Sequence, residues 1–503
     1  MCHSARRPVR LFRELILIDR PHTAPRLRAL WLLCFAAVLL CMPALLNRSP
    51  FVYPDTRGYY VGGAIAIDKI SSVVDRVFST QPAADSASAE GQETVRQARG
   101  VRSAFYSMFV YVLGGSVSLW FVIAAQALAT AWACLVAHRT LTGEAASANT
   151  EDTGYLPIMV LLAVATGASW SVSLLMPDAF AAVLILAVAT LVVYWRRCGP
   201  VARLLLAAAV SFAVLVHASH LPLAVATIVV GALIYRQEVW QHPARWIALV
   251  VAVAVTIPAM LAVSIVGFKQ VTLFPQRPPF MLARSIQDGP AKLYLEARCP
   301  AIGLEMCNHL DRLNTTADNF LWAPDGLYSA VSPDARDRIR AEEGSIIKGA
   351  ARDYPVLWAT AVARNLVQQL TGFGLIDYTL GSHASVTPTE MDSTMPDTPV
   401  PPWKTAIEVL HYVVVVASIA VLLWLWVSGR MSGGQRRFAL IVIASIIINA
   451  GVCGALSSPS YRYQTRVIWL LPFMAATLAL NQLRVPLRAV AFAQPVRAKD
   501  GRI

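Results

Sequence analysis

Ten long apolar runs recur along the chain and constrain its fold more than any other feature. About 20 consecutive apolar residues are enough to cross a bilayer as a helix, and 56% of the 503 residues are hydrophobic whereas only 15% are charged. The runs lie at residues 29–46, 116–138, 156–175, 179–195, 203–216, 221–235, 246–267, 405–427, 438–456 and 467–483. They exclude a soluble globular protein and predict an all-α polytopic membrane protein with about ten transmembrane helices.

The basic residues predict how these helices are oriented. The formal net charge is +13, which in a soluble protein would suggest a nucleic-acid partner. With a cytoplasmic N-terminus, the inner segments hold 21 Lys and Arg against 7 Asp and Glu, so they carry the whole excess. Because inner loops of membrane proteins are rich in Lys and Arg, we expect both termini in the cytoplasm and no nucleic-acid partner. The Ala, Val and Arg bias suggests a bacterial inner membrane.

The spacing of the runs divides the chain into regions. We expect a cytoplasmic N-terminal segment at 1–28, a transmembrane module at 29–267 with its first outer loop at 47–115, a periplasmic loop domain at 268–404, C-terminal transmembrane helices at 405–483 and a cytoplasmic tail at 484–503. The periplasmic segment has helical patterns and predicts a small, mainly helical outer domain.

Two of the eight cysteines fall in this outer domain. Cys299 and Cys307 are eight residues apart in the chain, and an oxidising compartment favours a disulfide between them. A metal site is the alternative, but it would need more His or Cys than the neighbouring His309 provides. The sequence therefore favours a disulfide.

An acidic residue follows the first span closely. Asp55 stands in the aromatic stretch Tyr53–Tyr60, only nine residues past the membrane run. A Pro-Asp turn whose carboxylate caps the next helix is the plainer interpretation. The functional interpretation makes Asp55 a general base or metal ligand held at the membrane surface, with Tyr59 and Tyr60 as a ring-stacking surface.

A second acid, Asp178, interrupts a long apolar stretch at the predicted outer surface. An Asp beside a span is costly unless it is paired or hydrated. Asp178 therefore either caps the following helix or belongs to a site. Two acids at one membrane level resemble a site more than either acid does alone.

Basic and aromatic residues collect at the same level. A short apolar run after Val101 suits a helix in the outer membrane interface, which would bring Arg102 and Tyr106 to the lipid headgroups. Ordinary anchoring in the interface is the alternative role for these side chains. The turn that we expect at 457–466 carries Arg462, Tyr463 and Arg466. Its arginines favour binding of a lipid phosphate, with snorkelling to headgroups as the alternative.

Two histidines mark the tight turn between the fifth and sixth runs. His217 and His220 are three residues apart, and they suit proton transfer, metal binding or a plain structural role in the turn.

This layout resembles the GT-C superfamily of integral membrane glycosyltransferases, which includes protein mannosyltransferases and the transferases that add aminoarabinose to lipid A. The resemblance implies a GT-C-like fold with interfacial helices in the first outer loop, a polyprenyl-phosphate sugar as donor, and a glycan, lipid or protein acceptor. It makes Asp55 and Asp178 catalytic, and it assigns substrate binding to Tyr59, Tyr60, Arg102, Tyr106, His220, Arg462, Tyr463 and Arg466. Use of a divalent cation is left open, since Asp55 is followed by Thr rather than by a second acid.

The sequence therefore predicts a glycosyltransferase with its active site on the periplasmic face. A transporter or flippase for a lipid-linked saccharide is one alternative, although it would place ionisable residues deep inside spans and show repeat symmetry. A polymerase or ligase of envelope glycans is another, since it uses the same class of donor.

Overall fold

The computed structural model describes residues 23–78, 102–115, 117–143, 152, 154–386, 391–397 and 399–492. Most of the predicted N-terminal segment, the middle of the first outer loop and the end of the predicted tail lie outside the described residues. Within them, nearly all elements are helices, and one two-stranded antiparallel sheet pairs β1 (His383–Val386) with β2 (Met391–Thr394).

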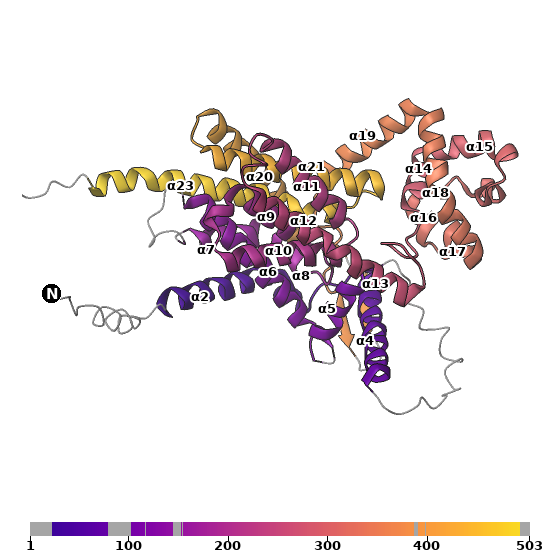
Figure 1. The fold of residues 1–503 in the computed structure, drawn as a ribbon, viewed down its shortest axis with the longest axis horizontal. Coiled ribbons are helices and arrows are strands. Elements are labelled where there is room, and N and C mark those ends of the chain that lie inside the picture. The colour runs from indigo at the N-terminus through magenta and orange to yellow at the C-terminus, as the bar shows by residue number, and fades with distance from the viewer. Residues whose placement is uncertain are drawn as a thin grey trace, which may run out of the picture.

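The helices follow one another along the chain (Figure 1). They are α2 (Thr23–Leu40), α3 (Met42–Asn47), α4 (Thr56–Phe78), α5 (Ala104–Gly114), α6 (Trp120–Thr142), α7 (Tyr155–Ala165), α8 (Ala168–Ser173), α9 (Ala179–Tyr194), η1 (Trp195–Arg197), α10 (Pro200–Val216), α11 (His220–Ile234), α12 (Pro243–Ala254), α13 (Thr256–Phe268), α14 (Phe280–Asp288), α15 (Pro290–Ile302), η2 (Glu305–Arg312), α16 (Ala317–Trp322), α17 (Leu327–Ala330), α18 (Pro333–Asp353), α19 (Pro355–Thr371), α20 (Pro402–Val427), α21 (Gly433–Leu456), α22 (Tyr461–Ile468) and α23 (Leu470–Phe492).

Six helical segments of the described chain are long and apolar enough to cross a membrane. They are Trp120–Thr142, Ala179–Arg197, Pro243–Phe268, Pro402–Val427, Gly433–Ala455 and Tyr461–Leu483. The other predicted spans form shorter apolar helices, at Leu27–Leu40, Tyr155–Ala165, Pro200–Val216 and His220–Ile234. The helical, multi-pass membrane class is therefore supported, whereas a total of ten spans stays a prediction.

Helix α9 forms the centre of the bundle (Figure 1). Of its 16 residues only Val193 is not fully buried, as its composition requires, because a helix that is apolar on all sides is stable in the interior. It packs against α6, α10, α11 and α21. Residues at the two ends of α9 therefore lie at opposite ends of the bundle, which we call the Asp178 end and the Tyr235 end.

The predicted span 156–175 is broken, and this corrects the expectation of one continuous helix. Helix α7 stops at Ala165, and the short α8 begins after Gly167. A side chain at Gly167 would meet the Cγ2 atom of Thr465 at 2.2 Å, so glycine permits α22 to pack against the break. After α8 the chain stays non-helical as far as the start of α9. Irregular backbone of this kind is tolerated where protein covers it.

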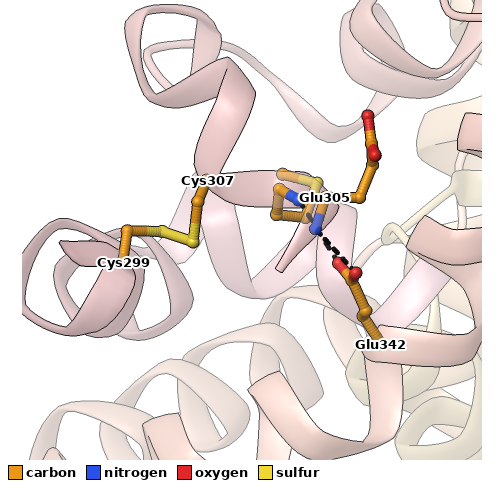
Figure 2. Close-up of a disulfide and its surroundings, with 5 residues drawn as sticks. Cys299, Glu305, Cys307 and Glu342 are labelled. Carbon is orange, nitrogen blue, oxygen red and sulfur yellow. Dashed lines mark hydrogen bonds between the residues drawn. A yellow bond between two sulfur atoms is a disulfide. The ribbon is translucent and has the colours of Figure 1, made fainter. Parts of the chain in front are cut away.

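The segment from α14 to α18 has a hydrophobic core of its own. Figure 1 shows it set apart from the bundle, with α19 leading back towards α21. The chain reverses between α15 and η2 at Gly303, which has a φ of 59°. A disulfide joins Cys299 to Cys307 across this turn, with the two Cα atoms 5.1 Å apart (Figure 2).

Two neighbouring glutamates of α18 hold the starts of other helices. The Glu342 carboxylate accepts hydrogen bonds from the backbone N–H groups of Glu305 and Met306, at 2.7 and 3.3 Å (Figure 2). The Glu343 carboxylate does the same for the first turn of α14. Since the first N–H groups of a helix lack partners within it, such caps stabilise the domain.

We expect the double substitution Cys299→Ser and Cys307→Ser to loosen this domain. A disulfide that closes so short a loop contributes about 2.5 kcal/mol by restricting the unfolded chain. Proteolysis within residues 280–353 of the native protein should therefore become more than tenfold faster. Cys34→Ser, which removes an exposed free cysteine of α2, is the matched control. Equal cleavage rates, or the absence of a disulfide-linked peptide in the unreduced digest, would contradict the assignment.

Candidate functional site

A buried cluster of one acid and two arginines lies where α9 begins, and we call it the Asp178 triad (Asp178, Arg462 and Arg466). Asp178 is fully buried. Its Oδ2 atom accepts a hydrogen bond from Nη1 of Arg462 at 3.0 Å, and its Oδ1 atom accepts one from Nη1 of Arg466 at 3.1 Å. With both oxygen atoms occupied, the carboxylate fixes the positions of two guanidinium groups. The triad carries one more positive charge than negative charge.

Arg466 is also held by two other segments of the bundle, the start of α11 and α21. Its Nη2 atom donates to the Ser219 hydroxyl at 3.1 Å, just before α11, and to Oδ1 of Asn449 in α21 at 2.9 Å. The Sγ atom of Cys453, also in α21, lies 3.2 Å from the same nitrogen. These contacts satisfy terminal N–H groups of the buried guanidinium, whose Nε atom has no hydrogen-bond partner among the described residues.

Arg462 is held between aromatic rings. Its guanidinium carbon lies 4.2 Å from the ring centroid of Tyr53 and 4.6 Å from that of Tyr463. Its Nη2 atom also donates to the Tyr463 hydroxyl at 3.1 Å. Cation–π contacts and one ion pair therefore set the direction of this side chain.

Asp55 lies in a second ion pair, at the surface of the same end. Its carboxylate accepts a hydrogen bond from Arg102 at 2.6 Å, and the Asp55 side chain is 37% exposed. The Ser103 hydroxyl caps α5 and thereby places Arg102 just before the helix. A side chain at Gly58 would lie 2.4 Å from the Arg102 guanidinium, so the missing side chain makes room for the pair.

Backbone contacts bring the two acids to one end of the bundle. Phe51 forms a parallel β-bridge with Leu174, and the Thr56 hydroxyl donates to the carbonyl oxygen of Leu175 at 3.3 Å. The start of the first outer loop is thereby tied to the irregular segment that precedes α9.

Charges of both ion-pair groups act on the pKa of the same residue, Tyr53. Burial raises the pKa of its hydroxyl, Arg462 lowers it, and the carboxylates of Asp377, Asp55 and Asp178 raise it again. The pKa of Tyr59 is likewise raised, first by burial and then by Asp55 and Asp178. The Asp178 triad and the Asp55–Arg102 pair therefore belong to one site.

The three tyrosines expected to bind substrate are packed inside the protein instead. Tyr59, Tyr60 and Tyr106 are at most 4% exposed. The Tyr106 hydroxyl donates to Gln126 at 2.7 Å, and the Tyr59 ring packs edge-on against the Tyr106 ring. These rings are part of the packed interior next to the site, and in this structure they offer no open stacking surface.

The two histidines also lie beside the triad. The Ser219 hydroxyl contacts Nδ1 of His217 at 2.7 Å and accepts a hydrogen bond from Arg466. His220 is fully buried and its Nδ1–H group donates to the Ala213 carbonyl at 2.7 Å. Their rings are 4.9 Å apart between centroids. They belong to the wall that encloses Arg466.

The segment expected to be an outer turn at 457–466 is a helix from Tyr461 onward, which corrects the prediction. Asp377 accounts for this start, because its Oδ2 atom accepts hydrogen bonds from the Ser460 hydroxyl at 2.9 Å and from the backbone N–H of Arg462 at 2.8 Å. A carboxylate at a helix N-terminus is favoured by its free N–H groups. Arg462 and Arg466 lie one turn apart on α22 and face Asp178 together.

Sequence inspection missed several residues of this site. A polar residue inside an apolar run was the available signal for Asn449 in Ile446–Ala450. For Tyr53, Ser219 and Asp377 the sequence offers no such signal, because their roles come from contacts with distant segments.

An apolar cavity of about 410 Å³ lies along α9, and no residue of the triad lines it. It is lined by Phe109, Ala125, Ala129, Trp132, Phe180, Val183, Leu205, Ala208, Ala209 and Phe212. Phe180, two residues after Asp178, packs against the rings of Phe109 and Phe212 with centroids 5.8 and 5.0 Å away. Leu205 is exposed, so the cavity reaches the outer surface of the bundle.

Among the described residues, no group of three or more His, Cys, Asp and Glu side chains is placed to hold a metal ion. The acids of the site are paired with guanidinium groups rather than with one another. This arrangement suits an anionic ligand directly.

Comparison with known proteins supplies no family for this chain. No protein-family model, curated protein or solved structure matches it. What the site binds therefore has to be argued from its own chemistry.

We expect Asp178→Asn to destabilise the protein strongly. It leaves two buried guanidinium groups without a counter-charge, and breaking a buried pair in this way costs about 3–5 kcal/mol. Thermal and denaturant unfolding of the purified protein in detergent measures the loss.

A double-mutant cycle tests the charge explanation. Arg466→Gln removes one of the two unpaired charges, so Asp178→Asn combined with Arg466→Gln should cost less than the sum of the single substitutions. Additive losses would show that the triad is not coupled as the distances indicate.

Proposed function

We propose that the protein is a glycosyltransferase of the bacterial inner membrane, which transfers a sugar from a polyprenyl-phosphate carrier to a glycan, lipid or protein acceptor on the periplasmic face. The observation that carries this proposal is that two buried arginines and the aromatic part of an apolar cavity lie near the same end of α9. The arginines suit a phosphate group, and the cavity suits a hydrocarbon chain. A lipid-linked sugar phosphate has both parts.

The charge of the triad supports a role in binding the phosphate. Arg462 and Arg466 share the Asp178 carboxylate in a buried setting, so the triad itself has a formal charge of about +1. The Asp55 carboxylate also lies within electrostatic range of Arg462. When the bond between the anomeric carbon and the phosphate oxygen breaks, the electron pair stays on the phosphate. Preorganised guanidinium groups stabilise that developing charge, and Arg462 is the nearer to the surface of the two.

Asp55 is the candidate general base. Its carboxylate is partly exposed and is held by one arginine only, whereas Asp178 is enclosed and has both oxygen atoms occupied. In the proposed reaction the acceptor hydroxyl attacks the anomeric carbon, and Asp55 takes the proton of that hydroxyl. Asp178 acts as a positioning residue, through the two arginines.

The cavity supports the lipid part of the donor. Its wall consists of apolar side chains from α5, α6, α9 and α10, and aromatic rings line its end near Asp178. Burial of an isoprenoid chain there would be favourable by the hydrophobic effect. The donor phosphate would then lie at the level of the triad.

A flippase for a lipid-linked saccharide would use the same arginines and the same cavity, but it would need no general base. We expect Asp55→Asn to lower sugar transfer from a labelled polyprenyl-phosphate donor by at least about 100-fold, because general bases contribute that order of rate. Transfer is measured in proteoliposomes, together with donor binding, which should persist.

Asp68→Asn, at an exposed position of α4, is the matched control for Asp55→Asn and should retain full activity. Thermal unfolding of both variants checks that they are folded. Full transfer by a folded Asp55→Asn protein would remove the assigned base and favour the flippase.

Gly58→Ala tests the geometry of the Asp55–Arg102 pair. The added methyl group would displace the end of the flexible Arg102 side chain from Asp55, so we expect a small change in stability and about a tenfold loss of transfer. Gly433→Ala, whose new methyl group would meet no atom within 4 Å, is the control. Unchanged transfer in Gly58→Ala would show that the pair is not required.

A further inference from the structure

A second group of arginines lies at the Tyr235 end of the bundle, where α9 stops, and sugar transfer makes no use of it. We call it the Tyr235 cluster: Tyr235, Glu238, Arg245 and Arg437, with Arg196 and His242 at its edge. It joins the end of α9, the end of α11 and the first turns of α12 and α21.

One tyrosine ring holds two of these guanidinium groups. The Arg245 and Arg437 guanidinium carbons lie 4.4 and 4.5 Å from the ring centroid of Tyr235. Arg245 also lies over Trp246 and donates to the Val192 carbonyl oxygen at 2.8 Å. Attraction to the ring partly offsets the repulsion between the two cations.

The arginines of the Tyr235 cluster outnumber its carboxylates. Arg437 is paired with Glu238 at 3.0 Å, and Arg196 contacts the His242 ring nitrogen at 3.2 Å. Arg245 lies within electrostatic range of Arg196, Arg437 and Glu238. Three guanidinium groups therefore face one carboxylate, and the cluster has a formal charge of about +2 with His242 neutral.

Of the three arginines, Arg245 is the most deeply buried, so its unbalanced charge is the most unfavourable. It is 5% exposed, and its Nε and Nη2 atoms are buried without a hydrogen-bond partner. Burying a cation without a counter-ion is unfavourable. Helix α12 begins at the same place without a side-chain cap from His242, and its N-terminus adds further positive potential.

The surroundings indicate where a compensating anion comes from. Leu233, Trp240 and Ile247 are exposed apolar side chains that flank the cluster in the chain. Such residues belong in contact with lipid, and a tryptophan beside arginines is typical of the headgroup level. An anion at this place is therefore more readily a lipid phosphate than a soluble one.

We propose that the Tyr235 cluster binds the phosphate group of an anionic phospholipid in the leaflet on that side, which the distribution of basic residues predicts to be cytoplasmic. Arg437, whose side chain is 42% exposed, and the exposed Arg196 donate to the phosphate oxygens. Guanidinium groups suit this contact because they bind phosphate in a bidentate manner. Arg245 lies beneath the phosphate, whose charge balances that of the buried guanidinium.

Lipid titration followed by native mass spectrometry tests the site. The purified full-length protein in detergent receives phosphatidylglycerol, phosphatidylcholine or inorganic phosphate. We expect one phosphatidylglycerol molecule to bind saturably and at least about tenfold more tightly than phosphatidylcholine. Arg437→Gln and Arg245→Gln should each weaken that binding by about tenfold or more, since each removes a charge-assisted contact or its field.

Arg430→Gln is the matched control, because Arg430 lies over Trp424 alone, 4.4 Å from its ring centroid. It should leave lipid binding unchanged. Arg437 is partly exposed, so Arg437→Gln keeps the test valid if Arg245→Gln fails to fold. Unchanged binding in a folded Arg437→Gln protein, or equal binding of phosphatidylcholine, would overturn the proposal. Displacement of the lipid by millimolar inorganic phosphate would assign the cluster to a soluble anion instead.

Discussion

The Asp178 end of the bundle depends on one buried carboxylate. Asp178 binds Arg462 and Arg466, which lie almost 290 positions further along the chain. Neither the acid nor the arginines would be stable alone in an apolar interior, so the surrounding backbone is organised to keep them together. The break before α9, the start of α22 at Asp377 and the polar groups of α11 and α21 all serve this requirement.

The sequence predicts the helical membrane class because apolar runs are a local property, and each run does contain a helix. It also singles out Asp55, Asp178, Arg102, Arg462 and Arg466, since charged residues beside spans are costly. It could not predict that Asp178 is enclosed while Asp55 stays accessible, because that difference arises from packing between distant segments. The break at Gly167 could not be predicted for the same reason, because Thr465, which packs against it, belongs to a distant segment. The sequence predicts a stacking surface at Tyr59 and Tyr60 because aromatic residues near a membrane are often exposed at its interface.

The two ends of α9 treat arginine differently. At the Asp178 end, a carboxylate, an amide and a hydroxyl accept hydrogen bonds from terminal guanidinium nitrogens, and the rings of Tyr53 and Tyr463 flank Arg462. At the Tyr235 end, one ring lies against Arg245 and Arg437, and Glu238 is the carboxylate of the cluster. The formal charge is therefore about +1 in the Asp178 triad and about +2 in the Tyr235 cluster. The arginines at the two ends of α9 therefore have different proposed ligands, although all of them contribute to the formal net charge of +13.

The Asp178 triad also has a consequence for biogenesis. Asp178 belongs to the first half of the chain, and its partners come from the last transmembrane segment. During synthesis the N-terminal helices emerge first, so the acid enters the membrane region long before an arginine exists to neutralise it. Until then the Asp178 carboxyl group can avoid a buried charge by keeping its proton or by staying in contact with water. Docking of α22 supplies both arginines at once, so burial of Asp178 as a carboxylate has to follow synthesis of the last helix.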